Sequence, residues 1–344
     1  MGVSLVTLGA AQRRSALRAQ PRSFAALTTM LAFSAALAGC NSSGTIERVP
    51  IPPRSTIRAA ADSLAAHGII KSPTWFRLRA RFSGGNRTVK AGVYLIARGT
   101  STATVLRRLR DGDAERFRVT LPVGGTIFDL AHNVEATLFI PADSVVSAAR
   151  DSAAMHGLNV PGTTAEGWLL PESFDFGGFD NARDVIARFV AGRLQTWDTA
   201  WDRRGAAQQL DRASLLVLAS IVEAEAKDPA ERPLIAAVYR NRIRLGMPLQ
   251  ADPTIEYGYL LRDGQRKGRL FNKDYQFQSP WNTYLHTGLP PGPIGNPSRE
   301  AIEAVLSPAK VPYLYFVAGP DGKSLFATTV SEHLRNIQRV RRLP

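Results

Sequence analysis

The sequence has few of the cysteine and histidine residues that form disulfides or bind metal ions. Of its 344 residues only one is cysteine, Cys40, and five are histidine, so no intramolecular disulfide can form. No His-x-x-x-His or Cys-x-x-Cys spacing occurs, and a phosphate loop, a dinucleotide fingerprint and a Gly-x-Ser-x-Gly elbow are also missing. We therefore expect no metal, no cofactor and no serine nucleophile.

Long apolar runs are also scarce, and the one that is present lies near the N-terminus. It extends from Phe24 to Gly39 and follows four arginines, which is the architecture of an export signal. Ala38 and Gly39 directly precede Cys40, and this resembles a bacterial lipoprotein lipobox in which Cys40 is lipidated. The alternative is an uncleaved helix anchor, for which a run of about 16 residues is short against a ~30 Å membrane core. We predict residues 1–39 as signal peptide or anchor and 40–44 as a tether.

Lysine is rare among the basic residues, yet the chain is strongly basic. It has 43 Lys and Arg against 29 Asp and Glu, a net charge of +14. A protein with this net positive charge can bind nucleic acid, anionic lipid or an acidic polymer. Because an exported protein does not meet the chromosome, we expect no nucleic-acid partner and retain membrane lipid and cell-wall polymer.

Hydrophobic periodicity and turn signals divide the exported part into three. Residues 45–113 predict a small β-α-α-β-α module, with strands at 45–51 and 89–96 and helices at 56–67, 73–82 and 104–109. Residues 114–164 predict a second small α/β module, with a strand at 117–121 and helices at 127–134 and 142–155. Residues 165–344 predict helices at 182–197, 214–226, 229–245 and 298–306, a hairpin within 313–329 and a last helix from 331. The fold class is therefore α+β.

Two acidic residues follow the most apolar predicted helix. Residues 215–222 are apolar almost all round, which predicts a buried segment, and Glu223 and Glu225 come directly after it. A carboxyl group at the edge of a core is desolvated, its pKa rises, and it can then act as a general acid near neutral pH. The alternative is an ion pair of Glu223 with Lys227, four residues on, at a wet surface. Spacing alone does not choose between the two glutamates.

Three loops carry polar and aromatic groups of a kind that binds sugars. They are 250–254, 279–284 and 288–294, and they combine amides, hydroxyls and aromatic rings with several prolines. Aromatic faces stack on sugar rings while amides and hydroxyls take the hydrogen bonds. The alternative is a set of proline-rich loops with a purely structural role.

At these residues the sequence resembles the endolytic murein transglycosylases of the YceG-like/MltG family. The resemblance covers about residues 45–342 and keeps the family's order of motifs. The stretches that carry it are Glu166–Phe174, Leu218–Glu225, Val238–Arg242, Leu245–Thr254, Asn282–Tyr284, Gly288–Ile294, Pro308–Lys310 and Tyr313–Val317. The first module, with Ile69–Phe76 and Lys90–Tyr94, is similar to the family's LysM-like region.

The resemblance implies roles for individual residues. The family's catalytic glutamate is taken as the first one after the Ala-Ser-Ile-Val stretch, which is Glu223. Residues at other motif positions are expected to line the glycan groove: Glu166, Glu172, Gln250, Asp252, Asn282 and Tyr284. Glu172 stands where many relatives carry Asp, and the lipobox stands where the family usually carries a transmembrane anchor. Residues 165–344 are then a mixed α/β catalytic domain.

The reaction implied is cleavage of the β-1,4 bond between MurNAc and GlcNAc in nascent peptidoglycan strands, without water, to give 1,6-anhydroMurNAc ends. The resemblance also implies anchoring in the inner membrane, a catalytic part in the periplasm, and work alongside peptidoglycan synthases. Two alternatives remain. One is a muramidase with Glu166 or Asp252 as the second carboxylate, which a hydrolase needs. The other is a catalytically inactive wall-binding lipoprotein.

Overall fold

The computed structural model describes residues 44–82 and 89–342. The predicted signal peptide or anchor, the lipobox with Cys40 and most of the tether lie outside these ranges. Within them, no helix is both long enough and apolar enough to cross a lipid bilayer.

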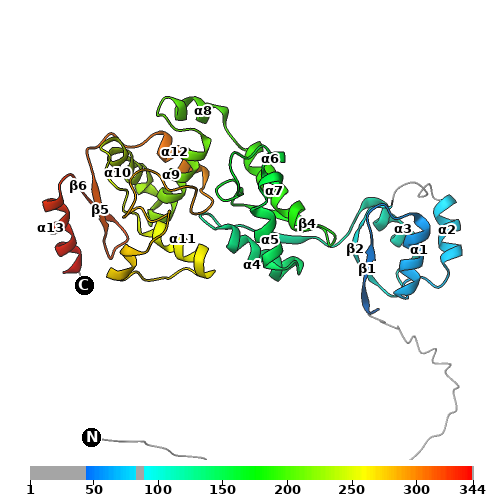
Figure 1. Ribbon diagram of the computed structural model, residues 1–344. Helices are drawn as coiled ribbons and strands as arrows, with labels where there is room; N and C mark the ends of the chain where they lie inside the picture. The colour runs from blue at the N-terminus through cyan, green and yellow to red at the C-terminus, as the bar shows by residue number, and fades with distance from the viewer. Residues whose placement is uncertain (1–43, 83–88, 343–344) are drawn as a thin grey trace, which may run out of the picture. The chain divides into compact units, whose positions relative to one another are not determined.

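The N-terminal part forms a small module around its own core (Figure 1). Strand β1 (Ile46–Ile51) pairs antiparallel with β2 (Gly92–Ala97), and three helices complete the module: α1 (Ile57–Ala66), α2 (Pro73–Phe82) and α3 (Thr102–Asp111). The side chains of Thr56 and Ser101 cap α1 and α3, as expected of hydroxyl residues before an apolar run. The element order β-α-α-β-α is the predicted one.

The next part is built on a second two-stranded sheet. Strand β3 (Phe117–Thr120) pairs antiparallel with β4 (Ser173–Phe176), a strand that the periodicity did not predict. Five helices accompany it: α4 (Ile127–Leu138), α5 (Ala142–Ala149), α6 (Ser152–Gly157), α7 (Ala182–Gln195) and α8 (Thr199–Ala206). The single helix predicted at 142–155 is two helices, because Asp151 caps a new helix directly after α5 ends.

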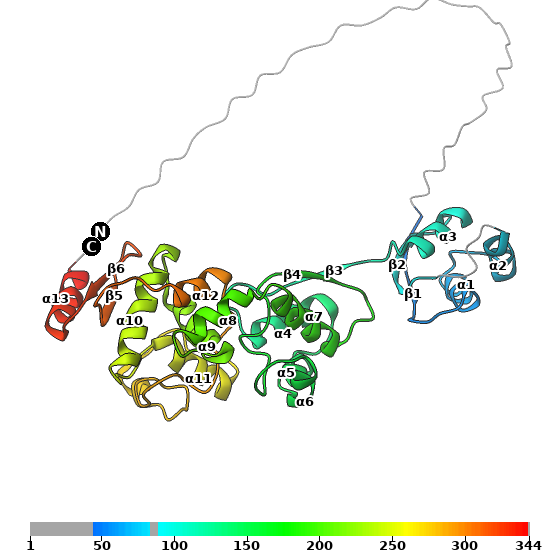
Figure 2. The same ribbon diagram turned by 90° about the horizontal axis from the view of Figure 1, so that it is seen from above.

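The C-terminal part surrounds α9 (Arg212–Glu225), whose residues 215–222 are all buried as predicted. Helix α9 packs against α8, α10, α11 and α12 (Figures 1 and 2). The remaining elements are η1 (Pro229–Glu231), α10 (Arg232–Arg244), α11 (Asp252–Asp263), η2 (Asn272–Gln276), α12 (Arg299–Leu306), β5 (Tyr315–Ala318), β6 (Ser324–Ala327) and α13 (Val330–Arg341). The first residues of α11, Asp252–Thr254, were expected as loop, since Asp252-Pro253 is also a turn signal. Here Pro253 occupies the first turn of a helix, where its missing N–H costs nothing.

One hydrophobic core extends from Val119 to Leu306, so the boundary predicted at residue 164 lies within a shared core. The N-terminal module has a separate core drawn from Val49 to Leu109. The coarse prediction of a mixed α and β fold is confirmed, and the three sheets in the described residues are antiparallel pairs. The LysM-like character of residues 45–113 stays a prediction.

Candidate active site

The end of α9 directs its two glutamates into different surroundings. Glu225 lines a pocket of about 380 Å³, within the size range of small-ligand sites. The walls come from α9, α10, α11, β5 and α13 and from the loops between them. The lining side chains that carry chemistry are Glu225, Lys227, Tyr239, Arg242, Gln250, Asp252, Tyr284, Tyr315 and His333.

Glu225 is held as a desolvated carboxyl group that solvent can still reach. The Tyr239 hydroxyl donates a hydrogen bond of 2.8 Å to its Oε1. Burial raises the pKa of Glu225 to about 7; the Tyr239 hydrogen bond opposes this rise and the nearby Asp252 adds to it. A carboxyl group with this pKa exists in both protonation states near neutral pH, which is what a group that first donates and later accepts a proton requires.

Asp252 lies in the same pocket at the start of α11. The Tyr284 hydroxyl donates to its Oδ1 at 2.6 Å, and the Tyr275 hydroxyl is 3.4 Å from its Oδ2. The two tyrosine rings meet edge to face with centroids 4.7 Å apart. Asp252 is thereby fixed as a hydrogen-bonded carboxylate beside an aromatic wall.

The pocket also contains cationic and aromatic groups. Arg242 is buried, and its guanidinium donates to the carbonyl oxygens of Leu249 and Leu314 at 2.6 and 2.7 Å. It also lies over the Tyr315 ring, which stacks on His333 at a centroid distance of 5.3 Å. Desolvation, and secondarily Arg242, lower the pKa of His333, so its imidazole is neutral near pH 7.

Glu223 does not line this pocket. Its Oε1 forms an ion pair of 2.6 Å with Nη2 of Arg232, and its side chain is only 5% exposed. Its Oε2 accepts from the backbone N–H of Ser298 at 2.8 Å and from the Ser298 hydroxyl. Both carboxylate oxygens are therefore bonded within the protein. The ion-pair partner is Arg232 and not the Lys227 that i,i+4 spacing suggested.

The other predicted site residues are distributed over the molecule. Gln250 and Tyr284 lie in the Glu225 pocket with Asp252. Glu166 is 1% exposed and accepts from Tyr257, Asn296 and the N–H of Ile127. Asn282 is 0% exposed and holds its loop by donating to two carbonyl oxygens. Glu172 is exposed and lines a separate cavity of about 320 Å³. The structure thus gathers three of the six expected groove residues around Glu225.

Several lining residues were not predicted as site residues: Lys227, Tyr239, Arg242, Tyr315 and His333. Tyr239, Arg242 and Tyr315 do lie inside the motif stretches that carry the family resemblance. Their polar groups come from α10 and β5, and periodicity assigned those segments only a structural role.

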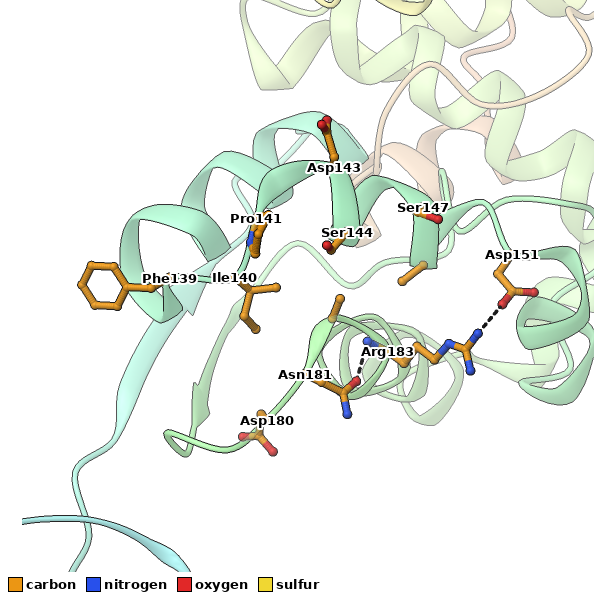
Figure 3. Close-up of a pocket in the computed structure, with 12 residues that line it drawn as sticks. Phe139, Ile140, Pro141, Asp143, Ser144, Ser147, Asp151, Asp180, Asn181 and Arg183 are labelled. Carbon is orange, nitrogen blue, oxygen red and sulfur yellow. Dashed lines mark hydrogen bonds and ion pairs between the residues drawn. The ribbon is translucent and has the colours of Figure 1, made fainter. Parts of the chain in front are cut away.

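A second cavity, of about 750 Å³, lies at the α4–α5 connection and the start of α7. Figure 3 shows Ile140 and Pro141 on one side of it and Asn181 and Arg183 on the other. Arg183 is ion-paired with Asp151 at 3.1 Å. None of the predicted site residues lines this cavity, so the chemistry concentrates in the Glu225 pocket.

The pocket contains a carboxyl group that titrates near neutrality, a second carboxylate and aromatic side chains. This combination is typical of the active site of an enzyme that uses acid–base catalysis. The chain matches the profile of the YceG-like family over residues 49–339, and it belongs to that family. The resemblance seen in the sequence motifs is confirmed.

Relatives and a solved structure agree with this placement. A Bacillus subtilis (strain 168) protein named endolytic murein transglycosylase is 29% identical over 85% of this chain and 84% of its own. A Streptococcus pneumoniae protein of the same name is 28% identical, and the match spans 57% of its length. The crystal structure of a putative yceG-like protein from Listeria monocytogenes aligns with a TM-score of 0.58 at 27% identity, over 84% of this chain and 98% of that one.

Proposed function

We propose that this protein is an endolytic peptidoglycan lytic transglycosylase and that Glu225 is its general acid and base. The observation that carries the proposal is the carboxyl group of Glu225, with a pKa of about 7, in one pocket with Asp252 and Tyr284. The relatives named endolytic murein transglycosylase support the substrate class and the enzyme class, a lyase.

In the proposed reaction, protonated Glu225 gives its proton to the oxygen of the β-1,4 bond between MurNAc and GlcNAc. The bond from C1 of MurNAc to that oxygen breaks, and GlcNAc leaves with a free hydroxyl. The carboxylate of Glu225 then removes the proton of the MurNAc C6 hydroxyl, whose oxygen bonds to C1. The products are a 1,6-anhydroMurNAc end and a regenerated acid, and no water is consumed.

The choice of Glu225 over Glu223 rests on what each carboxylate already binds. Glu223 has an ion pair on one oxygen and two donors on the other, all from the protein. A carboxylate with both oxygens bonded to protein donors and a side chain only 5% exposed is poorly placed to reach a substrate. Glu225 has one neutral donor, Tyr239, and solvent access from the pocket. The family-based assignment of Glu223 is thus the competing hypothesis. A murein digest by the Glu225→Gln and Glu223→Gln variants tests both assignments.

The pocket walls fit a sugar substrate. The rings of Tyr284 and Tyr315 line the pocket, while Gln250 is exposed and presents an amide. Gln250 adopts a left-handed backbone conformation, with φ of 52°, and its N–H donates to the carbonyl of Thr283. We propose that Gln250, Asp252 and Tyr284 bind the glycan. Glu166 and Asn282 are buried and Glu172 lines a different cavity, so the proposed binding set does not include them.

Product analysis tests the proposed chemistry. Residues 44–344 contain every residue of both hydrophobic cores, so this part is suited to digestion of purified murein. Mass spectrometry should find fragments with anhydro ends, which are one water lighter than reducing ends. Reducing ends would identify a muramidase instead. Asp252 is the carboxylate that could activate water, since it shares the pocket. Binding without fragments would identify a wall-binding protein.

We further propose that the N-terminus attaches the protein to the inner membrane, through lipid on Cys40 or through a helix, with the remainder in the periplasm. The LysM-like module would then bind glycan, and peptidoglycan synthases would be working partners. These proposals rest on the sequence signals and the family resemblance. Globomycin treatment separates the two anchors, because it blocks signal cleavage of lipoproteins only.

A further inference from the structure

Helix α2 of the N-terminal module is apolar on both its buried and its exposed faces. Phe76 and Ala80 are buried in the module, whereas Trp75, Leu78 and Phe82 are 60%, 45% and 82% exposed. At about 100° per residue these three side chains fall within roughly 60° of one another, opposite Phe76 and Ala80. Soluble proteins rarely gather large apolar side chains on an exposed face without a partner. We call Trp75, Leu78 and Phe82 the α2 apolar face.

The α2 apolar face lies on the outside of its module. Helix α2 packs on α1, and α1 packs on β1, so α2 is the outer layer (Figures 1 and 2). Trp75 is more exposed to solvent than the other four tryptophans. Trp168, Trp197 and Trp201 are at most 9% exposed and Trp281 is partly buried. An aromatic side chain at this exposed position can insert into an apolar environment outside the protein.

The positive charge of the exported chain is concentrated in this same module. Residues 45–113 contain thirteen Lys and Arg against four Asp and Glu, whereas residues 114–344 contain 26 against 25. On α2 itself, exposed Arg79 and Arg81 lie on the two sides of the apolar face. A helix that combines an aromatic and aliphatic stripe with flanking arginines is the pattern of a segment lying in a membrane interface. The positive charge adds attraction to anionic headgroups.

We propose that the α2 apolar face inserts into the headgroup region of an anionic lipid bilayer and holds the module on the membrane surface. Five residues lie between Cys40 and Ile46, the start of β1, so a chain anchored at Cys40 keeps the start of the module within about 20 Å of the bilayer. A sugar partner is disfavoured, because the face offers three adjacent apolar side chains and no amide or hydroxyl between them. The inference does not depend on the proposed catalytic function.

Vesicle binding of residues 44–344, which lack the anchor, tests the proposal. The probes are vesicles of phosphatidylcholine alone and of phosphatidylcholine with phosphatidylglycerol. The variant is Trp75→Ser/Leu78→Ser/Phe82→Ser, which alters exposed positions only. The matched control is Leu245→Ser/Phe271→Ser, whose side chains are 56% and 52% exposed and lie outside the module. Circular dichroism and digestion of soluble murein fragments verify that each variant folds.

We expect the parent chain to sediment with the anionic vesicles, to bind neutral vesicles more weakly, and to show a blue shift of Trp75 fluorescence. The triple variant should lose at least about tenfold in partitioning, and the control should retain it. A parent chain that does not bind anionic vesicles, or a triple variant that binds equally well, overturns the proposal. Murein sacculus binding that is lost in the triple variant while vesicle binding is unchanged also overturns it and assigns the face to the wall. A Glu225→Gln chain should bind vesicles normally, which separates this proposal from the catalytic one.

Discussion

The hydroxyl of Tyr239 on α10 lies 2.8 Å from Oε1 of Glu225 at the end of α9, and the contact links two helices that form one side of the pocket. The hydrogen bond lowers the pKa of Glu225 against the larger rise that burial causes. In a Tyr239→Phe variant the pKa of Glu225 should therefore rise, and the alkaline limb of the pH–activity profile should move to higher pH. A purely structural Tyr239 would alter unfolding but leave the pH profile in place, so both are measured.

Removal of Glu223 should destabilise the fold. Glu223 and Arg232 have side chains 5% and 14% exposed, and loss of one partner leaves a buried charge uncompensated. Such losses cost about 3–5 kcal/mol in the free energy of unfolding. Urea unfolding of Glu223→Ala measures this cost. The double variant Glu223→Ala/Arg232→Met should recover part of it, and failure to recover any would contradict the ion-pair explanation.

Tyr284 should matter for glycan binding through Asp252. Its hydroxyl donates to the carboxylate at 2.6 Å, whereas the Tyr275 hydroxyl is 3.4 Å away. Tyr284→Phe should lower kcat/KM by about tenfold or more, the range for hydrogen bonds to charged groups. Tyr275→Phe is the matched control and should have a smaller effect. Steady-state digestion of a soluble murein oligomer measures both, and equal effects would argue against a special role for Tyr284.

Stability should fall as the pH rises from about 4.5 to about 7 because of Glu166. Burial raises the pKa of Glu166 from 4.5 to about 7 in the folded protein. In this window the folded state keeps a proton that the unfolded chain releases, so the free energy of unfolding decreases with pH. Glu225 acts in the same direction. Urea unfolding across this range should show a shallower pH dependence for Glu166→Gln than for the parent, and parallel curves would contradict the assignment.

Much of the fold could be predicted from sequence, because periodicity and capping residues act locally. Thr126 and Asn181 begin α4 and α7 in the structure through capping boxes with Asp129 and Asp184. Strand β4 could not be predicted in this way, because its partner β3 lies more than fifty residues earlier and supplies the pairing. Helix α11 was missed since its first residues also fit a turn.

The choice between Glu223 and Glu225 could not be made from the local sequence. Helical geometry indicates that Glu223 and Glu225 point in different directions, but it does not say what lies in each direction. Arg232 and Ser298 approach Glu223 from 9 and 75 residues away, and Tyr239 approaches Glu225 from 14. Only the tertiary fold decides which carboxylate is bonded within the protein and which faces a pocket.

The most direct test of the account is a murein digest by residues 44–344 carrying Glu225→Gln or Glu223→Gln, each beside the parent chain and analysed by mass spectrometry. The account predicts that Glu225→Gln folds and loses about 10²–10⁴-fold in the release of anhydro-ended fragments, the usual worth of a general acid–base group. It predicts that Glu223→Gln is less stable but still releases such fragments. Full activity of Glu225→Gln, with loss of activity in a folded Glu223→Gln, would contradict it.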